Sequence, residues 1–397
     1  MKKRLLYYEI IPYISHKNAI VITGMRQVGK TTLMRQIFED IDQNKPKIWF
    51  DFDNPLDQRT FEDLEYRNIF ERLKIASGAE RDEQIYVFID EIQNFPEITK
   101  IIKFLIDNFG VKFIVTGSSN FYLKNLFPES LSGRKFLYEL SPLSFRECLY
   151  FRDKLSMEQA MKVRLEEGLA EKNITEFQKL DQEYEEYLRF GGFPEVVLTS
   201  DIETKRLVLK NIFTSFFEKD LKIISGFKDV RELRDFILLL VPRVGSMLDV
   251  SKLAAELGIL RPKAYSYLEF LRGIFFIRLL PKFTKSIDRS VAGGKKIYFT
   301  DNGILTTVGN VNDAQLFENA VVNQLALYGD LSFYNKRNKE EIDIILKKEK
   351  AFEVKLGGSK KYLEKAERIS AKIDIKQVFV VSRKYSKEAG MVFPMFL

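Results

Sequence analysis

Residues 19–31 read Ala-Ile-Val-Ile-Thr-Gly-Met-Arg-Gln-Val-Gly-Lys-Thr, an apolar run that leads directly into the pattern G-x-x-x-x-G-K-T. The apolar run predicts a buried strand, and the glycines predict a tight turn whose backbone N–H groups converge on one point. The start of the following helix adds partial positive charge at the same point. The stretch therefore predicts a phosphate-binding loop at the end of a strand.

The nucleotide is expected to be ATP, held by the loop and the first helical turn. Lys30 would reach the β- and γ-phosphates, and the Thr31 hydroxyl would bind Mg²⁺. The expected cofactor-binding residues are Gly24, Gln27, Val28, Gly29, Lys30, Thr31 and Thr32.

A second apolar run ends in two acids, at residues 86–91 (YVFIDE). A buried strand here would bring Asp90 to the metal, while Glu91 would polarise the attacking water, as phosphoryl transfer requires. A third run, 111–116, is followed by Gly-Ser-Ser-Asn. The side chains of 118–120 (Ser, Ser, Asn) would contact the γ-phosphate or the water; a polar turn without a catalytic role is the alternative.

The alternation of strands and helices over residues 1–145 predicts an α/β fold with a parallel sheet covered on both faces. Ligands of such sheets bind at the carboxyl ends of the strands, where the loop and Asp90 fall. The expected strands are 19–23, 47–52, 85–90, 111–116 and 135–140, with helices that include 30–41 and 97–109.

Length and composition narrow the class of protein. At 397 residues, 45% of them apolar, the chain is long enough for two or three domains. No apolar run reaches 18 residues, so no membrane span is expected, and the basic start reads as a helix, not a signal peptide. The single cysteine, Cys148, fits a reducing cytoplasm. The single histidine, His16, excludes histidine-based zinc sites and Ser–His–Asp triads.

We expect four regions: an ATPase core (1–145), a charged helical lid region (146–228), a winged-helix region (229–300) and a C-terminal α/β domain (301–397). In the third region, an amphipathic helix over 249–258, a short turn and a second helix from Arg261 predict a helix-turn-helix followed by a strand. If it docks on DNA, Arg261, Lys263 and Ser266 would face the major groove. The alternative is a packing module that never meets DNA.

The basic excess lies at the C-terminal end. Residues 331–397 hold 16 Lys and Arg against 9 Asp and Glu, which accounts for the whole net charge of +7. A local excess of this kind suggests a polyanion partner, with Lys336 and Arg337 as candidate nucleic-acid contacts. A lysine-rich solvated surface is the alternative.

The same region carries a second chemical pattern. Glu353 and Lys355 share one face of a predicted strand, and a hairpin would bring Asp343 beside Glu353. With Glu318 from a preceding helix, these carboxylates would hold one or two Mg²⁺ or Mn²⁺ ions, and Lys355 would orient water or stabilise the pentacoordinate phosphorus. A hairpin with polar outer faces is the alternative.

The sequence resembles prokaryotic AAA+-type ATPases that carry a restriction-endonuclease-like C-terminal domain. The resemblance rests on GMRQVGKTT, FIDEIQ (88–93), TGSS (116–119), LSGR (131–134), LSPLSFRE (140–147) and GGFPE (191–195). It implies an ATPase core, a winged helix and a PD-(D/E)xK-type nuclease fold, with Glu318, Asp343, Glu353 and Lys355 at the nuclease-type positions. It also implies a role for Arg134 as an arginine finger or sensor, in place of a structural ion pair.

Together these patterns predict a cytoplasmic, ATP-hydrolysing DNA-processing protein, with oligomerisation expected if Arg134 acts on a neighbouring subunit. The alternative is a regulatory or signalling NTPase whose winged-helix and C-terminal regions bind a protein partner.

Overall fold

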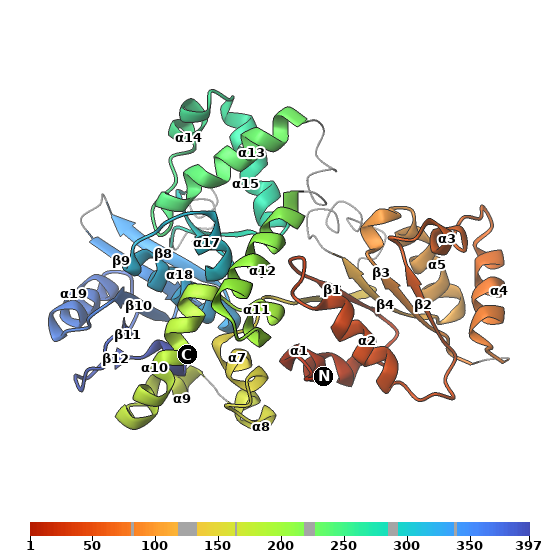
Figure 1. The fold of residues 1–397 in the computed structure, drawn as a ribbon, viewed down its shortest axis with the longest axis horizontal. Helices are drawn as coiled ribbons and strands as arrows, with labels where there is room; N and C mark the ends of the chain where they lie inside the picture. The colour runs from red at the N-terminus through yellow and green to blue at the C-terminus, as the bar shows by residue number, and fades with distance from the viewer. Residues whose placement is uncertain (81–82, 118–132, 163–164, 218–226, 285–292, 337–339) are drawn as a thin grey trace. The chain divides into compact units, whose positions relative to one another are not determined.

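The computed structural model describes the chain except for residues 81–82, 118–132, 163–164, 218–226, 285–292 and 337–339. It divides into two compact units (Figure 1). The N-terminal unit comprises Met1–Ser141 with Gly273–Phe275, and the C-terminal unit comprises Pro142–Arg272 with Phe276–Leu397.

The N-terminal unit is built on a fully parallel five-stranded sheet. Its strands run in the order β2-β3-β4-β1-β5, so β4 lies between the strand that precedes the phosphate loop and the strand that ends in Asp90. The strands are β1 (Ala19–Thr23), β2 (Lys47–Asp51), β3 (Tyr86–Asp90), β4 (Lys112–Gly117) and β5 (Lys135–Glu139), each within two residues of its predicted bounds.

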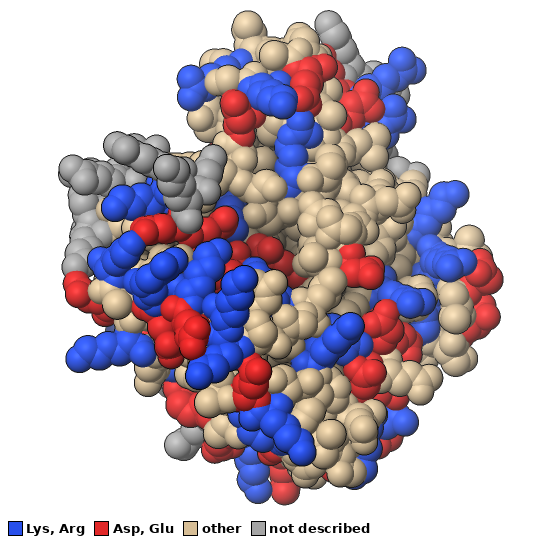
Figure 2. Space-filling model, turned by 90° about the vertical axis from the view of Figure 1, so that its left-hand side faces the viewer, with Lys and Arg blue, Asp and Glu red and all other residues tan. Residues whose placement is uncertain are grey.

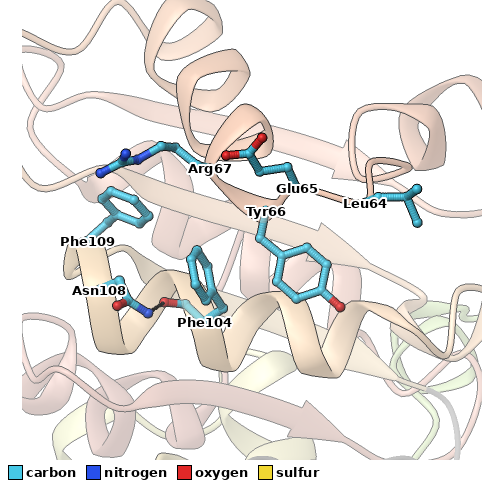
Figure 3. Close-up of a pocket in the computed structure, with 7 residues that line it drawn as sticks. All are labelled: Leu64, Glu65, Tyr66, Arg67, Phe104, Asn108 and Phe109. Carbon is cyan, nitrogen blue, oxygen red and sulfur yellow. Dashed lines mark hydrogen bonds between the residues drawn. The ribbon is translucent and has the colours of Figure 1, made fainter.

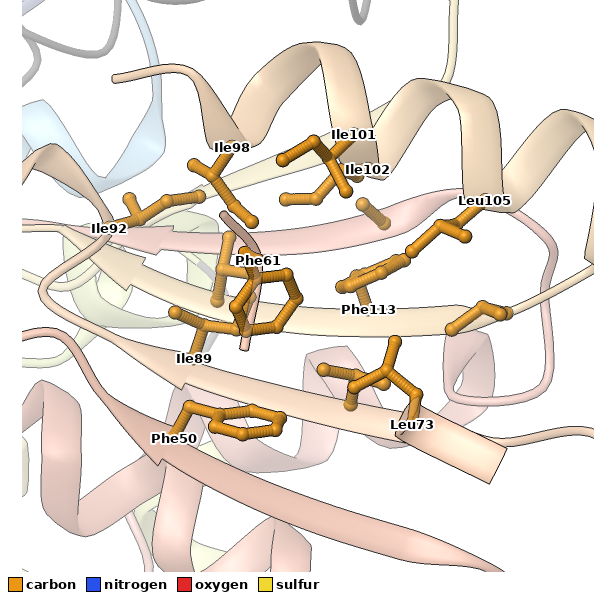
Figure 4. Close-up of a cluster of buried hydrophobic side chains, with 14 of the residues drawn as sticks. Phe50, Phe61, Leu73, Ile89, Ile92, Ile98, Ile101, Ile102, Leu105 and Phe113 are labelled. Carbon is orange, nitrogen blue, oxygen red and sulfur yellow. The ribbon is translucent and has the colours of Figure 1, made fainter. Parts of the chain in front are cut away.

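Helices cover the sheet on both faces, as predicted. On one face, α4 (Tyr66–Ser77) and α5 (Ile98–Phe109) bury a core of branched aliphatic and aromatic side chains, including Phe61, Ile102 and Phe113 (Figure 4). The other face carries α2 (Lys30–Asp40), whose Leu33, Met34 and Ile37 are fully buried. Short helices complete the unit: α1 (Leu5–Ile10), as predicted for the N-terminus, and α3 (Pro55–Arg59).

The C-terminal unit begins with helices. They are α7 (Phe145–Phe151), α8 (Met157–Met161), α9 (Leu165–Ala170), α10 (Ile174–Phe190), α11 (Pro194–Leu198), α12 (Ile202–Ser215) and α13 (Phe227–Leu240). Arg383 near the C-terminus pairs with Asp181 and Glu185 of α10, which ties these helices to the end of the chain. The predicted lid region thus belongs to the compact unit that contains the C-terminal sheet, and its role as a lid stays a prediction.

The predicted helix-turn-helix elements are present as α14 (Val250–Leu257) and α15 (Arg261–Gly273), separated by three residues that begin with Gly258. An antiparallel pair follows, β6 (Ile277–Pro281) with β7 (Lys295–Phe299). The sequence predicted a strand from residue 274, but pairing begins at Ile277 and the return strand β7 was not predicted. Next come α17 (Asn302–Val308) and α18 (Asp313–Leu325).

A second five-stranded sheet ends the chain, in the order β12-β11-β10-β9-β8. Its strands are β8 (Leu331–Lys336), β9 (Glu340–Leu346), β10 (Lys350–Lys355), β11 (Gln377–Ser382) and β12 (Met391–Val392). β8, β9 and β10 are antiparallel neighbours, and β11 joins β10 in parallel through the crossover helix α19 (Lys360–Ala371). This is the predicted element order, with β12 as an unpredicted edge strand.

The GGFPE motif has a structural explanation. The buried Asp301 carboxylate accepts hydrogen bonds from the backbone N–H of Gly192 at 2.7 Å and of Ile304 at 3.0 Å. Gly191 has a φ of 70°, and a Cβ there would lie 2.2 Å from an Asp301 oxygen. Glycine is therefore required where α10 ends against the start of α17. Among the described helices, none combines the length and apolar character needed to cross a bilayer.

Candidate functional site

The phosphate loop has the expected backbone. Gly24 has a φ of 148°, and a Cβ there would lie 2.1 Å from the Leu140 carbonyl oxygen, so no other residue fits. Gln27 and Gly29 also have positive φ, at 61° and 95°. These left-handed residues curl the backbone between β1 and α2, which directs the loop toward the carboxyl end of β1.

Lys30 begins α2 and is 5% exposed. Its ammonium donates to the carbonyl oxygens of Gly24 and Met25, both at 3.0 Å, so it folds back over the loop. The predicted lysine is therefore held at the loop, where it can exchange these carbonyls for phosphate oxygens. The first turn of α2 has no acidic residue, which leaves the positive end of the helix available to an anion.

Arg4, which was not predicted as a site residue, binds the backbone of the phosphate loop and links it to the segment after β5. It is 6% exposed and donates to the carbonyl oxygens of Val28 and Ser141, each at 2.8 Å. No local pattern marks this contact, because it joins a residue before the first helix to two distant segments.

Asp90 lies where the prediction placed it, at the end of β3, and contacts the predicted metal ligand Thr31. Burial raises the pKa of the Asp90 carboxyl, and this outweighs the opposing effect of hydrogen bonds from the hydroxyls of Thr116 and Thr31. Thr116, on the central strand β4, is an unpredicted member of the site and donates to Asp90 Oδ1. Hard oxygen donors beside a phosphate loop suit Mg²⁺, so these residues fit the implied metal.

Glu91 follows directly in a left-handed conformation with a φ of 53°, which is uncommon for a residue with a side chain. Its N–H donates to Thr116 Oγ1 at 3.2 Å, and its carboxylate accepts from Gln93 and lies 4.0 Å from the Arg26 guanidinium. The left-handed turn at Glu91 is therefore held by contacts of both its backbone and its side chain. The predicted residues Ser118, Ser119 and Asn120 lie outside the described residues.

Arg134 lies at the amino-terminal end of the sheet strands, opposite the end that carries the phosphate loop. Its carbonyl accepts from Ala19 N–H at 2.8 Å, at the beginning of β1, whereas the phosphate loop follows the end of that five-residue strand. A strand of this length separates the two by roughly 16 Å. The guanidinium pairs with Asp107 at 2.6 Å. Arg134 is therefore remote from the nucleotide site of its own chain.

In the C-terminal unit the four predicted nuclease-type residues lie together. Asp343 on β9 accepts from the Val354 N–H at 2.9 Å and from the Lys355 ammonium at 3.2 Å. Lys355 also pairs with Glu353 at 2.9 Å. Period-two alternation on the antiparallel strands β9 and β10 produces this arrangement. Glu318 joins from the middle of α18, which begins three residues before the predicted helix.

Two further residues of this acidic site, both on β7, were not predicted from the sequence. Lys296 is 3% exposed, and its Nζ lies 2.7 Å from Glu341, 3.8 Å from Glu318 and 3.9 Å from Asp343. Tyr298 donates to Glu318 at 2.6 Å. The signal available in the sequence was Lys-Lys before an apolar strand, which also fits an ordinary strand start.

The electrostatics of the acidic site are those of crowded carboxylates. Burial, followed by the charge of Asp343, raises the pKa of Glu318 and of Glu353, each to about 7. Glu353 Oε2 is buried and has no hydrogen-bond partner within the described part of the chain. A cation would satisfy this oxygen, so the donor set suits Mg²⁺ or Mn²⁺. In the described arrangement, however, no three acidic, Cys or His residues are placed to hold a metal ion together.

A basic cavity opens in the same unit. It has a volume of about 670 Å³ and is lined by Lys282, Lys336 and Lys372, together with Phe283 and Tyr334. Figure 2 shows Lys and Arg side chains gathered on the face that carries the C-terminal elements, with acidic side chains between them. The predicted contact Lys336 therefore lines a lysine-bearing cavity, whereas Arg337 lies outside the described residues.

The candidate DNA contacts of α15 differ from each other. Arg261 and Ser266 are exposed, as predicted. Lys263 is not directed outward: its ammonium pairs with Glu232 of α13 at 2.5 Å and is half-buried, because α13 lies beside it. A DNA role for Lys263 would require that pair to open.

Another cavity, of about 480 Å³, lies in the N-terminal unit between α4 and α5. Tyr66, Phe104 and Phe109 line it, with Arg67 and Glu65 at its side (Figure 3). None of its lining residues belongs to the phosphate loop or to the ends of β3 and β4.

Comparison with known proteins gives two family matches. Residues 16–149 match the AAA domain family, and residues 181–315 match a domain of unknown function. The first match spans the parallel sheet and the phosphate loop, so this part of the N-terminal unit is similar to AAA domains.

The chain is also similar to uncharacterized proteins of Methanocaldococcus jannaschii (29% identity, covering 82% of this chain and 71% of that one) and Haemophilus influenzae (28%, 83% and 79%). Among solved structures it is similar to Aeropyrum pernix ORC1 in complex with DNA (11% identity, TM-score 0.30, covering 76% of this chain and 90% of that one). It is also similar to Pyrobaculum aerophilum Cdc6p (13%, TM-score 0.31, 79% and 92%).

Proposed function

We propose that this protein hydrolyses ATP in its N-terminal unit and that its C-terminal unit binds DNA and cleaves it at the acidic site with a divalent metal ion. The ATPase is supported by three residues at the carboxyl ends of β1 and β3: Thr31 and Lys30 at the start of α2, and Asp90. The DNA-processing half rests on one observation: Asp343, Glu353 and Lys355 converge in the same unit as a lysine-lined cavity.

In the ATPase, Thr31 and Asp90 would hold Mg²⁺, which neutralises charge on the phosphates when bound. Lys30 releases the Gly24 and Met25 carbonyls and pairs with phosphate oxygens. Glu91 orients the attacking water and accepts its proton, and its backbone N–H contact with Thr116 fixes its carboxylate relative to Asp90.

In the acidic site, Glu318, Asp343 and Glu353 would hold Mg²⁺ or Mn²⁺, which activates water and stabilises the leaving oxygen when bound. Lys355 lies within 3.2 Å of Asp343 and 2.9 Å of Glu353, so it is placed to stabilise negative charge on a phosphodiester beside these acids. The lysines of the cavity would hold neighbouring phosphates, and Arg261 of a winged-helix region would add a contact.

Substitutions at the nucleotide site test the ATPase. Lys30→Ala should abolish ATP binding and turnover, while Glu91→Gln should bind ATP and not hydrolyse it. Normal hydrolysis by either variant would overturn the assignment.

The nuclease half is tested separately, on single-stranded, duplex, forked and four-way DNA with and without ATP. Glu353→Gln should remove Mg²⁺- or Mn²⁺-dependent cleavage and leave ATP hydrolysis unchanged. Retained cleavage in Glu353→Gln would reject the acidic site, and a wild type that cuts no substrate with either metal would reduce the domain to a binding platform.

A regulatory NTPase with a protein partner is the second candidate, favoured by the Lys263–Glu232 pair, which neutralises one of the charges offered to DNA. Salt dependence separates the two. DNA affinity should fall roughly a thousandfold or more for a fourfold rise in salt if six or more phosphates are contacted. Absence of DNA binding at low salt would favour the regulator.

A further inference from the structure

Lys296 is a buried lysine that reaches the acidic site from a different part of the fold. It belongs to β7, the second strand of the β6–β7 pair, whereas the acids stand on α18, β9 and β10. Its side chain is 3% exposed, and Nζ lies 5.4 Å from the centre of the Phe333 ring. A lysine is rarely this buried unless its charge is compensated.

The compensation comes from three carboxylates at once. Nζ lies within 4.0 Å of Glu318, Glu341 and Asp343, with Glu341 nearest at 2.7 Å. Burial lowers the pKa of the Lys296 ammonium, but the three carboxylates outweigh burial and raise it overall. Lys296 is therefore a fixed positive charge among the acids.

The charges of the site do not balance. Glu318, Glu341, Asp343 and Glu353 supply four carboxylates, while Lys296 and Lys355 supply two ammonium groups. When all six groups are ionised, two negative charges remain among them; the Lys365 ammonium, which also acts on Glu353, is outside this count. Lys355 pairs with Glu353 Oε1, whereas the buried Glu353 Oε2 has no hydrogen-bond partner within the described part of the chain.

We propose that Lys296 is a resident cation that competes with the divalent metal, so that metal enters only as the Lys296 ammonium withdraws from Glu318 and Asp343. The inference rests on the proposed metal site and adds its regulation. Glu341 keeps the ammonium when the contacts with Glu318 and Asp343 open, because it is already the nearest partner at 2.7 Å and its side chain is 41% exposed.

Metal binding, without any cleavage assay, tests the competition. Mn²⁺ is titrated into nucleotide-free full-length protein and followed by calorimetry and by the electron paramagnetic resonance of free Mn²⁺. Lys296→Met should bind Mn²⁺ at least about tenfold more tightly than the wild type, because a unit positive charge a few ångströms from the ion is gone. Lys296→Gln, which keeps a polar donor for Glu341, should change affinity in the same direction if Lys296→Met fails to fold.

Two controls isolate the effect. Lys295→Met removes the same charge from the adjacent residue, whose ammonium lies 4.0 Å from Glu269 and outside the acidic site, and should leave affinity unchanged. Glu353→Gln should abolish the Mn²⁺ binding that Lys296→Met enhances.

The outcomes separate the two hypotheses. If the wild type binds Mn²⁺ and both Lys296 variants bind it equally or more weakly, the competition is wrong while the metal site stands. If neither the wild type nor any Lys296 variant binds Mn²⁺ in a manner sensitive to Glu353→Gln, the metal site fails and the inference fails with it.

Discussion

The Thr116 hydroxyl donates a hydrogen bond to the Asp90 carboxylate, which joins the carboxyl ends of the paired strands β4 and β3. The same Thr116 oxygen accepts the N–H of Glu91. One side chain thus orients the proposed metal ligand and the proposed water-activating residue together.

Thr116→Val should therefore lower kcat for ATP about tenfold to a hundredfold, as expected when a residue behind a metal ligand is lost. Steady-state kinetics with a coupled phosphate assay measures it. Thr23→Val is the matched control, because Thr23 is buried on β1 and its hydroxyl has no hydrogen-bond partner among the described residues. Equal losses in the two variants would show that the effect is general destabilisation of the strands.

Gly24→Ala and Gly29→Ala distinguish a steric requirement from a conformational one. Gly24→Ala would place Cβ 2.1 Å from the Leu140 carbonyl and should cost about 3 kcal/mol or more of stability. Gly29→Ala meets nothing within 4 Å and pays only for its φ of 95°, about 1–2 kcal/mol. Trp49 on β2, the single tryptophan, reports unfolding of this unit in urea. Equal costs would contradict the packing argument.

The features of the N-terminal unit that could be predicted from the sequence are local ones. The phosphate loop and the strands of the N-terminal sheet were predicted within two residues, because apolar runs and the G-x-x-x-x-G-K-T spacing are local signals. The insertion of β4 between β1 and β3 was not predicted, since strand order depends on long-range pairing. Thr116 was not predicted for the same reason: the residues expected to contact the nucleotide were 118–120, which directly follow β4.

In the acidic site, too, the residues placed by local periodicity were predicted and those placed by long-range packing were not. Period two placed Asp343, Glu353 and Lys355 together, because β9 and β10 are adjacent antiparallel strands. Lys296 and Tyr298 lie about 20 residues or more from Glu318 in sequence and reach it only through the packing of β7 against α18. No periodicity in the sequence encodes that contact.

The lysines of the basic cavity should act through charge alone. Lys336→Ala and Lys282→Ala should each weaken binding to DNA of any sequence and reduce the slope of log K against log salt by about 1. Fluorescence anisotropy with duplexes of different sequence measures both effects. Lys360→Ala serves as the control, because Lys360 is exposed on α19 and does not line the cavity. An unchanged slope in the two cavity variants would exclude this cavity as a phosphate-binding surface.

Asp301 should make stability depend on pH. Burial raises the pKa of its carboxyl to about 6 from an ordinary 3.8, so between these values the folded state binds more protons than the unfolded state. Its contribution is present below pH 4 and is lost as the pH rises through 6, by about 3 kcal/mol.

Asp301→Asn cannot titrate, so its free energy of unfolding should rise relative to that of the wild type as the pH increases from 4 to 7. Denaturation followed by circular dichroism at several pH values measures the difference, and Trp49 fluorescence identifies the transition of the N-terminal unit. A difference that is constant with pH would show that Asp301 keeps an ordinary pKa in the folded chain.

Arg134 provides a test of assembly. It lies at the amino-terminal ends of the strands, whereas the phosphate loop lies at their carboxyl ends. If Arg134 acts in catalysis, it can therefore contact only the nucleotide of a neighbouring subunit. Arg134→Ala should then bind ATP normally and hydrolyse it slowly, while Lys30→Ala should bind no ATP and still supply Arg134. Mixing the two inactive variants should restore turnover, because an Arg134→Ala site then receives the arginine of a Lys30→Ala neighbour. Asp107→Asn, which removes the negative charge from the 2.6 Å pair and keeps the arginine, should retain activity. If mixing restores nothing and Asp107→Asn is as impaired as Arg134→Ala, the pair with Asp107 is the whole role of Arg134.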